Sequence, residues 1–534
     1  MGDQIPFDIA YEYLSGEALL AYHAEGGTGS QDIAYKTYIG GAWSAEQYLD
    51  DTGNATHNVY SLIKMASKKG SDQIGLIGAD DSNDDANAWI WDGSAWGSFT
   101  EITASANPPN HEQVAIAWET NSGHLLAVAA LLSDIVSKEY TTSWSAAVTF
   151  TFVENNLQRL SLKPNPVGDD MIIAMGEDGD EFETAYWTGS AWANNVVQDA
   201  DPLGTGRAFD FAWEPTGSKG LLVWSDTAGL ISYKTYTAPN TWGAQTDVAM
   251  GANAHPWVQL RTNPSSSGGV KILGAVMETT ALDLGAIKWD GTTFSVVGAS
   301  TFSADVGTTS WESFELESTV VPNEVQYLVC KNLAAGSCDA SAEFTKFDGA
   351  SGYDVVASGV DLGSYPSLAT TLESNGDLWV AYAKDVDSTT RGIYARFLDY
   401  PSGGWAAAET IDSLTGTLFT RPSIGIDTDN NVHALYVGTA GPTLYYKSRT
   451  GGSWGSRTTI DSSSDNPTVM VRAPNNPAYG TASGGIYWKT TTSATYFHYI
   501  PEFETVIAPI GITLFVVWAW RRRMTPRTGK SLED

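Results

Sequence analysis

The chain has 534 residues, of which 17% are charged and 11% are aromatic, and it contains 53 glycines. This composition is typical of a folded protein of strands and turns, and it excludes a disordered chain. The net charge of −33 at pH 7 excludes a nucleic-acid-binding protein, because no basic surface is available to neutralise phosphates.

The first fifty residues predict four short strands separated by turns. Alternating or continuous apolar stretches mark the strands, and glycine-containing pairs mark the tight turns. The expected strands are Phe7–Tyr13, Ala18–Tyr22, Ile33–Tyr38 and one that begins at Trp43. Before residue 505, no stretch has a long helical period, so the fold class is all-β.

One hairpin motif recurs along the chain. Residues 89–96 read Trp-Ile-Trp-Asp-Gly-Ser-Ala-Trp, in which the Asp-Gly pair suits a tight turn between two strands. Its versions recur about every fifty residues, which indicates a repeat protein. Their closing aromatic residues are Trp43, Trp96, Trp144, Trp192, Trp242, Phe294, Tyr353, Trp405 and Trp454.

Four-stranded units of this length are typical of β-propeller blades. The sequence holds nine complete units and a degenerate tenth over residues 467–499. Propellers usually have about four to eight blades, so residues 1–500 form either one large ring or two rings. We expect the first strand of each unit to line the ring centre.

The units also repeat in pairs. Residues 7–12 resemble residues 114–119 and 209–214, and each of these segments ends in glutamate. Odd units resemble odd units, and the Asp-Gly hairpins lie mostly in even ones. This indicates duplication of a two-blade block, with chance similarity between short strands as the alternative.

Two loops between second and third strands are strongly acidic. In a propeller these loops share one face with the links between blades, so we expect one acidic face and one plain face. Carboxylate clusters favour hard cations such as Ca²⁺, and ordinary solvation of the loops is the alternative. No motif calls for another cofactor. The candidate ligands are Asp80, Asp81, Asp84, Asp85, Glu177, Asp178, Asp180 and Glu181.

The only two cysteines, Cys330 and Cys338, flank the middle loop of the seventh unit. Outside the cell they are expected to form a local disulfide, and two buried thiols are the alternative. With no histidine nearby in sequence, they do not indicate a zinc site.

The last units of the repeat contain short segments that resemble those of a known repeat family. Residues 421–427, 432–436 and 444–447 resemble sialidase-like (BNR-type) propeller repeats. Residues 448–454 are similar to that family's Asp-box hairpin, although Thr450 stands where the aspartate should be. A sialidase requires three arginines for the substrate carboxylate together with Tyr/Glu and Asp. The arginines here form no coherent set, so we assign no catalytic residue.

The C-terminal end differs from the repeats. Residues 501–505 form a linker that begins Pro501-Glu502-Phe503. Residues 506–520 are almost all apolar and are followed at once by Arg521, Arg522 and Arg523. A helix of this length spans about 22 Å, short of the roughly 30 Å hydrocarbon core, and the arginines can extend toward the headgroups.

This order of motif, apolar segment and basic cluster resembles the archaeal PEF-CTERM sorting signal. The resemblance implies recognition by an archaeosortase-type membrane enzyme. The positive residues of the tail, 521–534, are expected to stay inside, which places residues 1–500 on the extracellular face of the membrane. The first residues of the chain do not resemble a signal peptide.

We therefore expect a cell-surface, membrane-anchored β-propeller that acts as a non-catalytic binding or adhesion module for an extracellular glycan, protein or cation. A secreted sialidase-like glycoside hydrolase and a structural envelope component are the alternatives.

Overall fold

The computed structural model describes residues 7–499 except for a set of connecting segments. The segments outside the description are 1–6, 16, 24–31, 40–41, 50–59, 81–82, 107–111, 153–156, 178–181, 201–207, 227–228, 251–254, 256, 264–269, 279–283, 298–313, 319–325, 332–340, 348–352, 362–367, 374–376, 400–403, 418, 427–430, 439–442, 462–467, 472–483, 490–493 and 500–534.

The described strands form ten antiparallel sheets, and each sheet is built from strands that follow one another along the chain. The first five sheets are β1 (Phe7–Tyr11), β2 (Ala18–His23), β3 (Ile33–Ile39), β4 (Ala42–Trp43) and β5 (Gln47–Tyr48); β6 (Tyr60–Ser67), β7 (Ile74–Asp80), β8 (Ala86–Trp91) and β9 (Trp96–Thr103); β10 (Val114–Trp118), β11 (Leu125–Ala130), β12 (Asp134–Tyr140) and β13 (Val148–Thr151); β14 (Leu157–Pro164), β15 (Met171–Glu177), β16 (Phe182–Trp187) and β17 (Trp192–Asp199); and β18 (Phe209–Trp213), β19 (Lys219–Ser225), β20 (Leu230–Thr237), β21 (Thr241–Trp242) and β22 (Thr246–Ala249).

The last five sheets are β23 (Trp257–Thr262), β24 (Ile272–Met277), β25 (Leu284–Trp289) and β26 (Phe294–Val297); β27 (Phe314–Ser318), β28 (Gln326–Lys331), β29 (Ser341–Phe347) and β30 (Tyr353–Asp361); β31 (Leu368–Leu372), β32 (Leu378–Asp385), β33 (Arg391–Asp399), β34 (Gly404–Trp405) and β35 (Glu409–Asp412); β36 (Phe419–Ile426), β37 (Val432–Gly438), β38 (Thr443–Thr450), β39 (Ser453–Trp454) and β40 (Thr458–Asp461); and β41 (Thr468–Val471), β42 (Gly484–Lys489) and β43 (Ala494–Tyr499).

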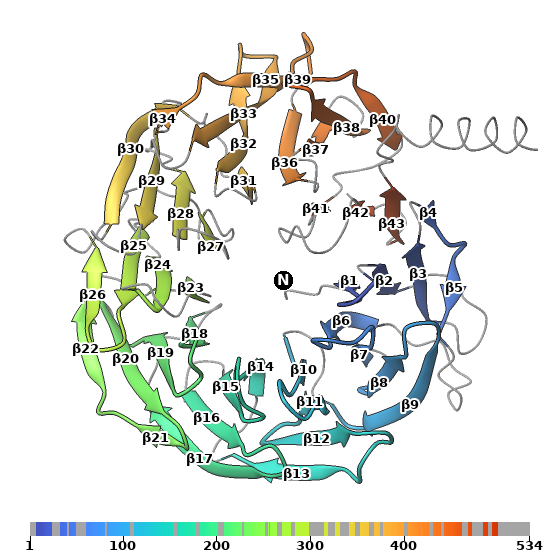
Figure 1. Cartoon of the computed structure of the whole chain (residues 1–534), viewed down its shortest axis with the longest axis vertical. Helices are drawn as coiled ribbons and strands as arrows, with labels where there is room; N and C mark the ends of the chain where they lie inside the picture. Colours follow the sequence, from blue (N-terminus) through green and yellow to red (C-terminus); the bar gives the residue numbers. More distant parts are fainter. Residues whose placement is uncertain are drawn as a thin grey trace, which may run out of the picture.

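The ten sheets stand around one centre and form a single ring, in which β43 of the last sheet contacts β2 of the first (Figure 1). The first strands, such as β1 and β18, lie nearest the centre, and this confirms the prediction made from their sequences. Strand β1 ends at Tyr11 instead of Tyr13, because the N–H of Glu12 donates to the carbonyl of Glu17 at 2.8 Å and closes the turn.

Five sheets have the predicted four strands. Four sheets have five, because the fourth strand is split into two pieces that both pair with the third strand. In the first sheet, β4 and β5 are separated where the N–H of Ser44 bonds back to the carbonyl of Thr37 at 2.8 Å. The sheet β41–β43 has three described strands.

The predicted Asp-Gly hairpins are present. Gly93 has a φ of 99°, which a glycine adopts without strain. The carboxylate of Asp92 accepts the N–H groups of Ser94 and Ala95 at 2.8 and 2.9 Å and fixes the turn between β8 and β9. The same hydrogen bonds recur around Asp290 in the turn between β25 and β26.

The core lies in the seams between neighbouring sheets. Trp89 and Trp91 of the second sheet pack with Leu76 against Tyr35 of the first sheet, and the ring centroids of Tyr35 and Trp91 are 6.1 Å apart. Burying each large apolar side chain stabilises the fold by about 1.5–3 kcal/mol. A single sheet has no other place to bury these faces, so the ring is held together by its seams.

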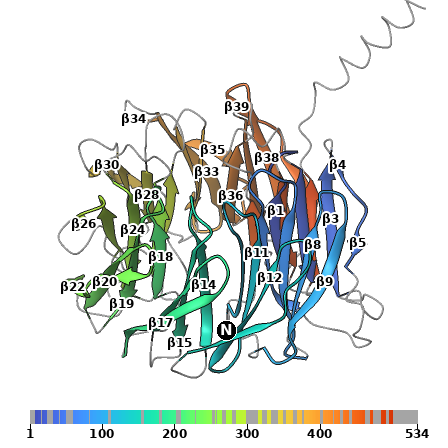
Figure 2. The ribbon, with the colours of Figure 1, turned by 60° about the horizontal axis from the view of Figure 1, so that its bottom comes forward.

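The antiparallel order divides the connections between two faces of the ring (Figure 2). The turns between first and second strands and between third and fourth strands, such as 12–17 and 92–95, lie on one face, called the turn face here. The second strands end and the third strands begin on the opposite face, called the loop face, as at Asp80 and Asp85. Within the described residues no helix is long and apolar enough to cross a membrane, and 506–520 is not among those residues.

Candidate functional site

The first acidic loop connects β7 to β8 on the loop face. Asp80 is the last residue of β7, and its N–H donates to the carbonyl of Asp85 at 2.8 Å, which extends the pairing of the two strands by one step. Asp84 adopts a left-handed φ of 58°, and this turns the chain so that its carbonyl accepts the N–H of Ala106. Asp81 lies outside the described residues.

Strand alternation places the acidic groups in one seam. Leu76 and Trp89 face the first sheet. Asp80 is four residues from Leu76, and Asp85, directly before β8, is four residues from Trp89, so both face it too. Asn87 of β8 is two residues from Trp89 and faces the same seam. Glu101 of β9 is directly opposite Asn87, so its side chain faces this seam as well. The seam between the first two sheets is therefore aromatic toward the turn face and acidic at the loop face.

The crowding changes the acidity of one carboxyl group. Burial, together with the negative charges of Glu101, Asp80 and Asp84, raises the pKa of Asp85 to about 6. Asp80 is 1% exposed and accepts a hydrogen bond from Asn83 Nδ2 at 3.0 Å. The end of the seam thus holds several carboxyl groups at a cost in electrostatic repulsion.

A buried amide adjoins these carboxyl groups. Asn87 is 4% exposed, and its Nδ2 donates to the hydroxyl of Tyr60 at 2.9 Å. Among the described residues, its Oδ1 has no hydrogen-bond partner. A buried carbonyl oxygen without a donor is costly, and either a cation or a water molecule would satisfy it. The oxygen atoms of Asp80, Asp85, Asn87 and Glu101 are the atom type that Ca²⁺ prefers.

The second acidic loop is only partly described. Glu177 is the last residue of β15, in the same place as Asp80 in β7. Asp178, Asp180 and Glu181 lie outside the described residues. A calcium site in either loop stays a prediction.

A different carboxylate feature recurs on the turn face, and its role was not predicted from the sequence. The glutamate at the end of three first strands accepts a hydrogen bond from an indole N–H of the following sheet. Trp91 donates to Glu12 at 2.5 Å, Trp187 donates to Glu119 at 2.6 Å and Trp289 donates to Glu214 at 2.8 Å. Each bond ties one two-sheet block together, and the recurring glutamate in the block motif was the signal for it.

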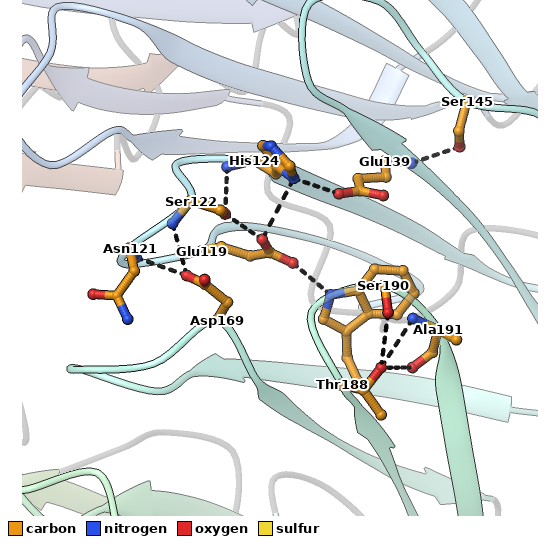
Figure 3. A network of polar contacts seen from close by, with 11 residues as sticks. Glu119, Asn121, Ser122, His124, Glu139, Ser145, Asp169, Thr188, Ser190 and Ala191 are labelled. Atoms are coloured by element: carbon orange, nitrogen blue, oxygen red, sulfur yellow. Dashed lines mark hydrogen bonds and ion pairs between the residues drawn. The ribbon is translucent and has the colours of Figure 1, made fainter.

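The middle copy carries two further groups (Figure 3). The Nδ1 atom of His124 is 2.6 Å from Glu139 Oε1 and 3.7 Å from Glu119 Oε2. Ser122 Oγ also donates to Glu119 Oε2, and Asp169 accepts the N–H of Ser122 at 2.9 Å and so fixes the turn. Among the described residues, the possible metal-ligand atoms of Glu119, His124 and Glu139 all lie within 4.8 Å of one another.

Glu119 is the most buried member of this group, with its side chain 1% exposed. Burial raises its pKa, and the nearby charges of Glu139 and Asp169 act in the same direction, whereas the hydrogen bonds from Ser122 and Trp187 oppose the increase. The carboxyl group is therefore oriented by two donors, with a histidine at its side.

Most of the other site residues predicted from the sequence are not among the residues that the structure describes. Cys330 is in β28, and Cys338 is outside the described residues, so the disulfide stays a prediction. The anchor residues Pro501, Glu502, Phe503, Arg521, Arg522 and Arg523 are also outside them, and the membrane anchor stays a prediction.

No protein-family model and no curated protein matches the sequence. Solved structures similar to the fold include a lectin from Burkholderia pseudomallei, with 11% identity over 66% of this chain and 98% of that chain and a TM-score of 0.43. A eukaryotic initiation factor has 11% identity over 85% of this chain and 88% of that chain, with a TM-score of 0.40. The six-bladed lectin of Aleuria aurantia has 12% identity over 55% of this chain and 95% of that chain, with a TM-score of 0.28. At these values, the similarity does not bear on what the present chain binds.

Proposed function

We propose that this chain is a non-catalytic binding propeller whose loop face takes an extracellular ligand with the help of a bound cation. The observation that carries the proposal is the end of the first seam, where Asp80, Asp85 and Glu101 face the same side as the buried amide of Asn87. The ligand class is an extracellular glycan or protein.

A cation would remove two unfavourable features of this seam at once. It would offset the burial and the repulsion that raise the pKa of Asp85, and it would give Asn87 Oδ1 a partner. Ca²⁺ takes about six to eight oxygen ligands, so four protein side chains leave coordination positions for water or for the hydroxyl groups of a sugar. A cation held in this way supports ligand binding on a face whose own charge is negative.

We also propose that the propeller lies on the outer face of the cell membrane. Residues 506–520 would insert as the anchor, with Arg521, Arg522 and Arg523 on the inner side, after recognition by an archaeosortase-type enzyme. The order of these three parts in the sequence supports this placement.

Calorimetric titration of the EDTA-treated protein with Ca²⁺ tests the cation site. We expect heat of binding at pH 7.5 that is absent when NaCl of equal ionic strength replaces CaCl₂. The triple variant Asp80→Asn, Asp85→Asn, Glu101→Gln should lose this heat. Glu17→Gln, which removes a carboxylate from the turn face, is the matched control and should retain it.

A glycan array probed with and without EDTA tests the ligand class. Binding to glycans that depends on Ca²⁺ and is lost in the triple variant supports the proposal. Calcium titrations in which NaCl gives the same response, or in which the triple variant behaves like the natural protein, would refute the cation site.

A further inference from the structure

The turn between the first and second strands has the same backbone in three sheets. The N–H of Glu12 donates to the carbonyl of Glu17, that of Glu119 to His124, and that of Glu214 to Lys219, each at 2.8 Å. These three pairs are therefore equivalent positions of the repeat. The first position is always glutamate, whereas the second is a different residue in each copy.

The third strand provides another equivalent position. The carbonyl groups of Thr37, Glu139 and Thr235 each accept an N–H at 2.8 Å from the residue that follows the closing tryptophan of the hairpin. Two copies have threonine here, and only the copy with His124 has glutamate. His124 and Glu139 are thus the two departures from the repeat, and they face each other in the same sheet. The fold does not require them, since the first and fifth sheets form without them.

The two departures meet at the shared glutamate. In Figure 3 the side chains of Glu119, His124 and Glu139 point toward one another from the end of β10, the turn and β12. Their side chains are 1%, 37% and 20% exposed respectively, so the group opens to solvent on the His124 side while Glu119 forms its base.

We propose that Glu119, His124 and Glu139 bind a divalent transition-metal ion of the zinc class on the turn face. One imidazole nitrogen and two carboxylate oxygens are ligands that Zn²⁺ accepts, and three protein ligands leave a fourth position for water or a ligand. Bond lengths of about 2.0–2.2 Å place tetrahedral ligand atoms about 3.4 Å apart. The distances of 2.6 and 3.7 Å from His124 Nδ1 lie on either side of this value.

The surroundings orient the deepest ligand. Trp187 Nε1 donates to Glu119 Oε1 at 2.6 Å, which leaves Oε2 directed at His124. Hydrogen bonds of this kind hold a metal-binding carboxylate in place. The hydrogen bond from an indole to the glutamate is common to the three copies. In the copy with His124 it also orients a ligand of the proposed metal site.

Metal quantification after equilibrium dialysis tests the proposal. The EDTA-treated protein is dialysed against micromolar Zn²⁺ in the presence of millimolar Ca²⁺, which occupies oxygen-only sites such as the loop face. We expect one tightly bound zinc per chain at pH 7.5. Its affinity should fall as the pH is lowered toward 5, because protons compete for the imidazole and the carboxylates.

The repeat supplies conservative variants for the same measurement. Glu139→Thr and His124→Lys introduce residues that other copies already hold at these positions, so the fold should be retained, and each should weaken zinc binding by at least tenfold. Co²⁺ should give the visible spectrum of a four-coordinate ion in the natural protein, and this spectrum should be absent in Glu139→Thr.

A gain-of-site variant completes the test. Glu17→His together with Thr37→Glu rebuilds the group around Glu12 and should add a second equivalent of zinc, whereas Thr37→Glu alone should add none. Equal zinc binding by the natural protein and Glu139→Thr would overturn the proposal and leave His124 as an ion-pair partner of the two glutamates. The loop-face variant Asp85→Asn should keep its zinc, so this result is independent of the calcium titration.

Discussion

Replacing Asp85 by asparagine tests how much the burial of its carboxylate and the neighbouring negative charges destabilise the loop end of the first seam. The change removes one ionisable group and keeps the size and shape of the side chain. A pKa of about 6 for the folded protein compares with about 3.9 for an unfolded aspartate. The folded protein therefore binds more protons than the unfolded chain between about pH 4 and pH 6, and its stability falls as the pH rises through this window.

The magnitude follows from the difference between the two pKa values. About two pKa units correspond to about 3 kcal/mol at neutral pH if none of the interaction is screened. Asp85 is 9% exposed and follows the exposed Asp84, so solvent screens part of this interaction and we expect about 1 kcal/mol. In the absence of Ca²⁺, Asp85→Asn should raise the free energy of unfolding by this amount at pH 7.5 and leave it unchanged at pH 4.

Urea unfolding followed by tryptophan fluorescence at pH 4, 5, 6 and 7.5 is the assay. A thermal scan is less sensitive, because 1 kcal/mol shifts the midpoint of a cooperative unit of this size by only about 1 °C. Asp92→Asn is the matched control of opposite sign, since hydrogen bonds from Ser94 and Ala95 lower the pKa of Asp92, and its replacement should reduce stability at pH 7.5. A neutral or destabilising effect of Asp85→Asn at pH 7.5, or an equal stabilisation at pH 4, would show that burial and the neighbouring charges do not destabilise the ionised Asp85.

Three further predictions concern other parts of the ring. Glu214→Ala should lower the free energy of unfolding by about 1.5–3 kcal/mol, because the buried indole of Trp289 loses a charged acceptor. Glu214→Gln keeps an acceptor oxygen and should cost less. Equal losses of the two variants in urea unfolding would contradict this reasoning. Gly78→Ala should lower the free energy of unfolding by about 1–3 kcal/mol, because the new Cβ would lie 2.6 Å from the buried ring of Tyr60. An unchanged urea midpoint would show that the side chains of the seam move to accommodate the methyl group. Cys330 and Cys338 should be bonded in exported protein, so that reduction adds the mass of two hydrogen atoms, whereas thiol labelling that is the same before and after reduction would exclude the bond.

The sequence alone determined the repeat and the local structure of its units. Hydrophobic alternation and turn residues act over a few positions, so strands such as Ala18–His23 and the Asp-Gly turn at Gly93 were predicted from neighbouring residues. The acidic loop at Asp80 was also visible, because its carboxylates are adjacent in the chain. The repeating glutamate at Glu119 was visible as a pattern without a role.

Only the tertiary structure decided what these elements contact. The choice between one ring and two depends on the packing angle at every seam, a sum of many small side-chain contacts that no local pattern encodes. Trp187 reaches Glu119 across a seam, and Glu139 meets His124 through the register of paired strands. Spacing in the chain does not report such distances, because register and sheet packing bring these side chains together only after the ring has closed.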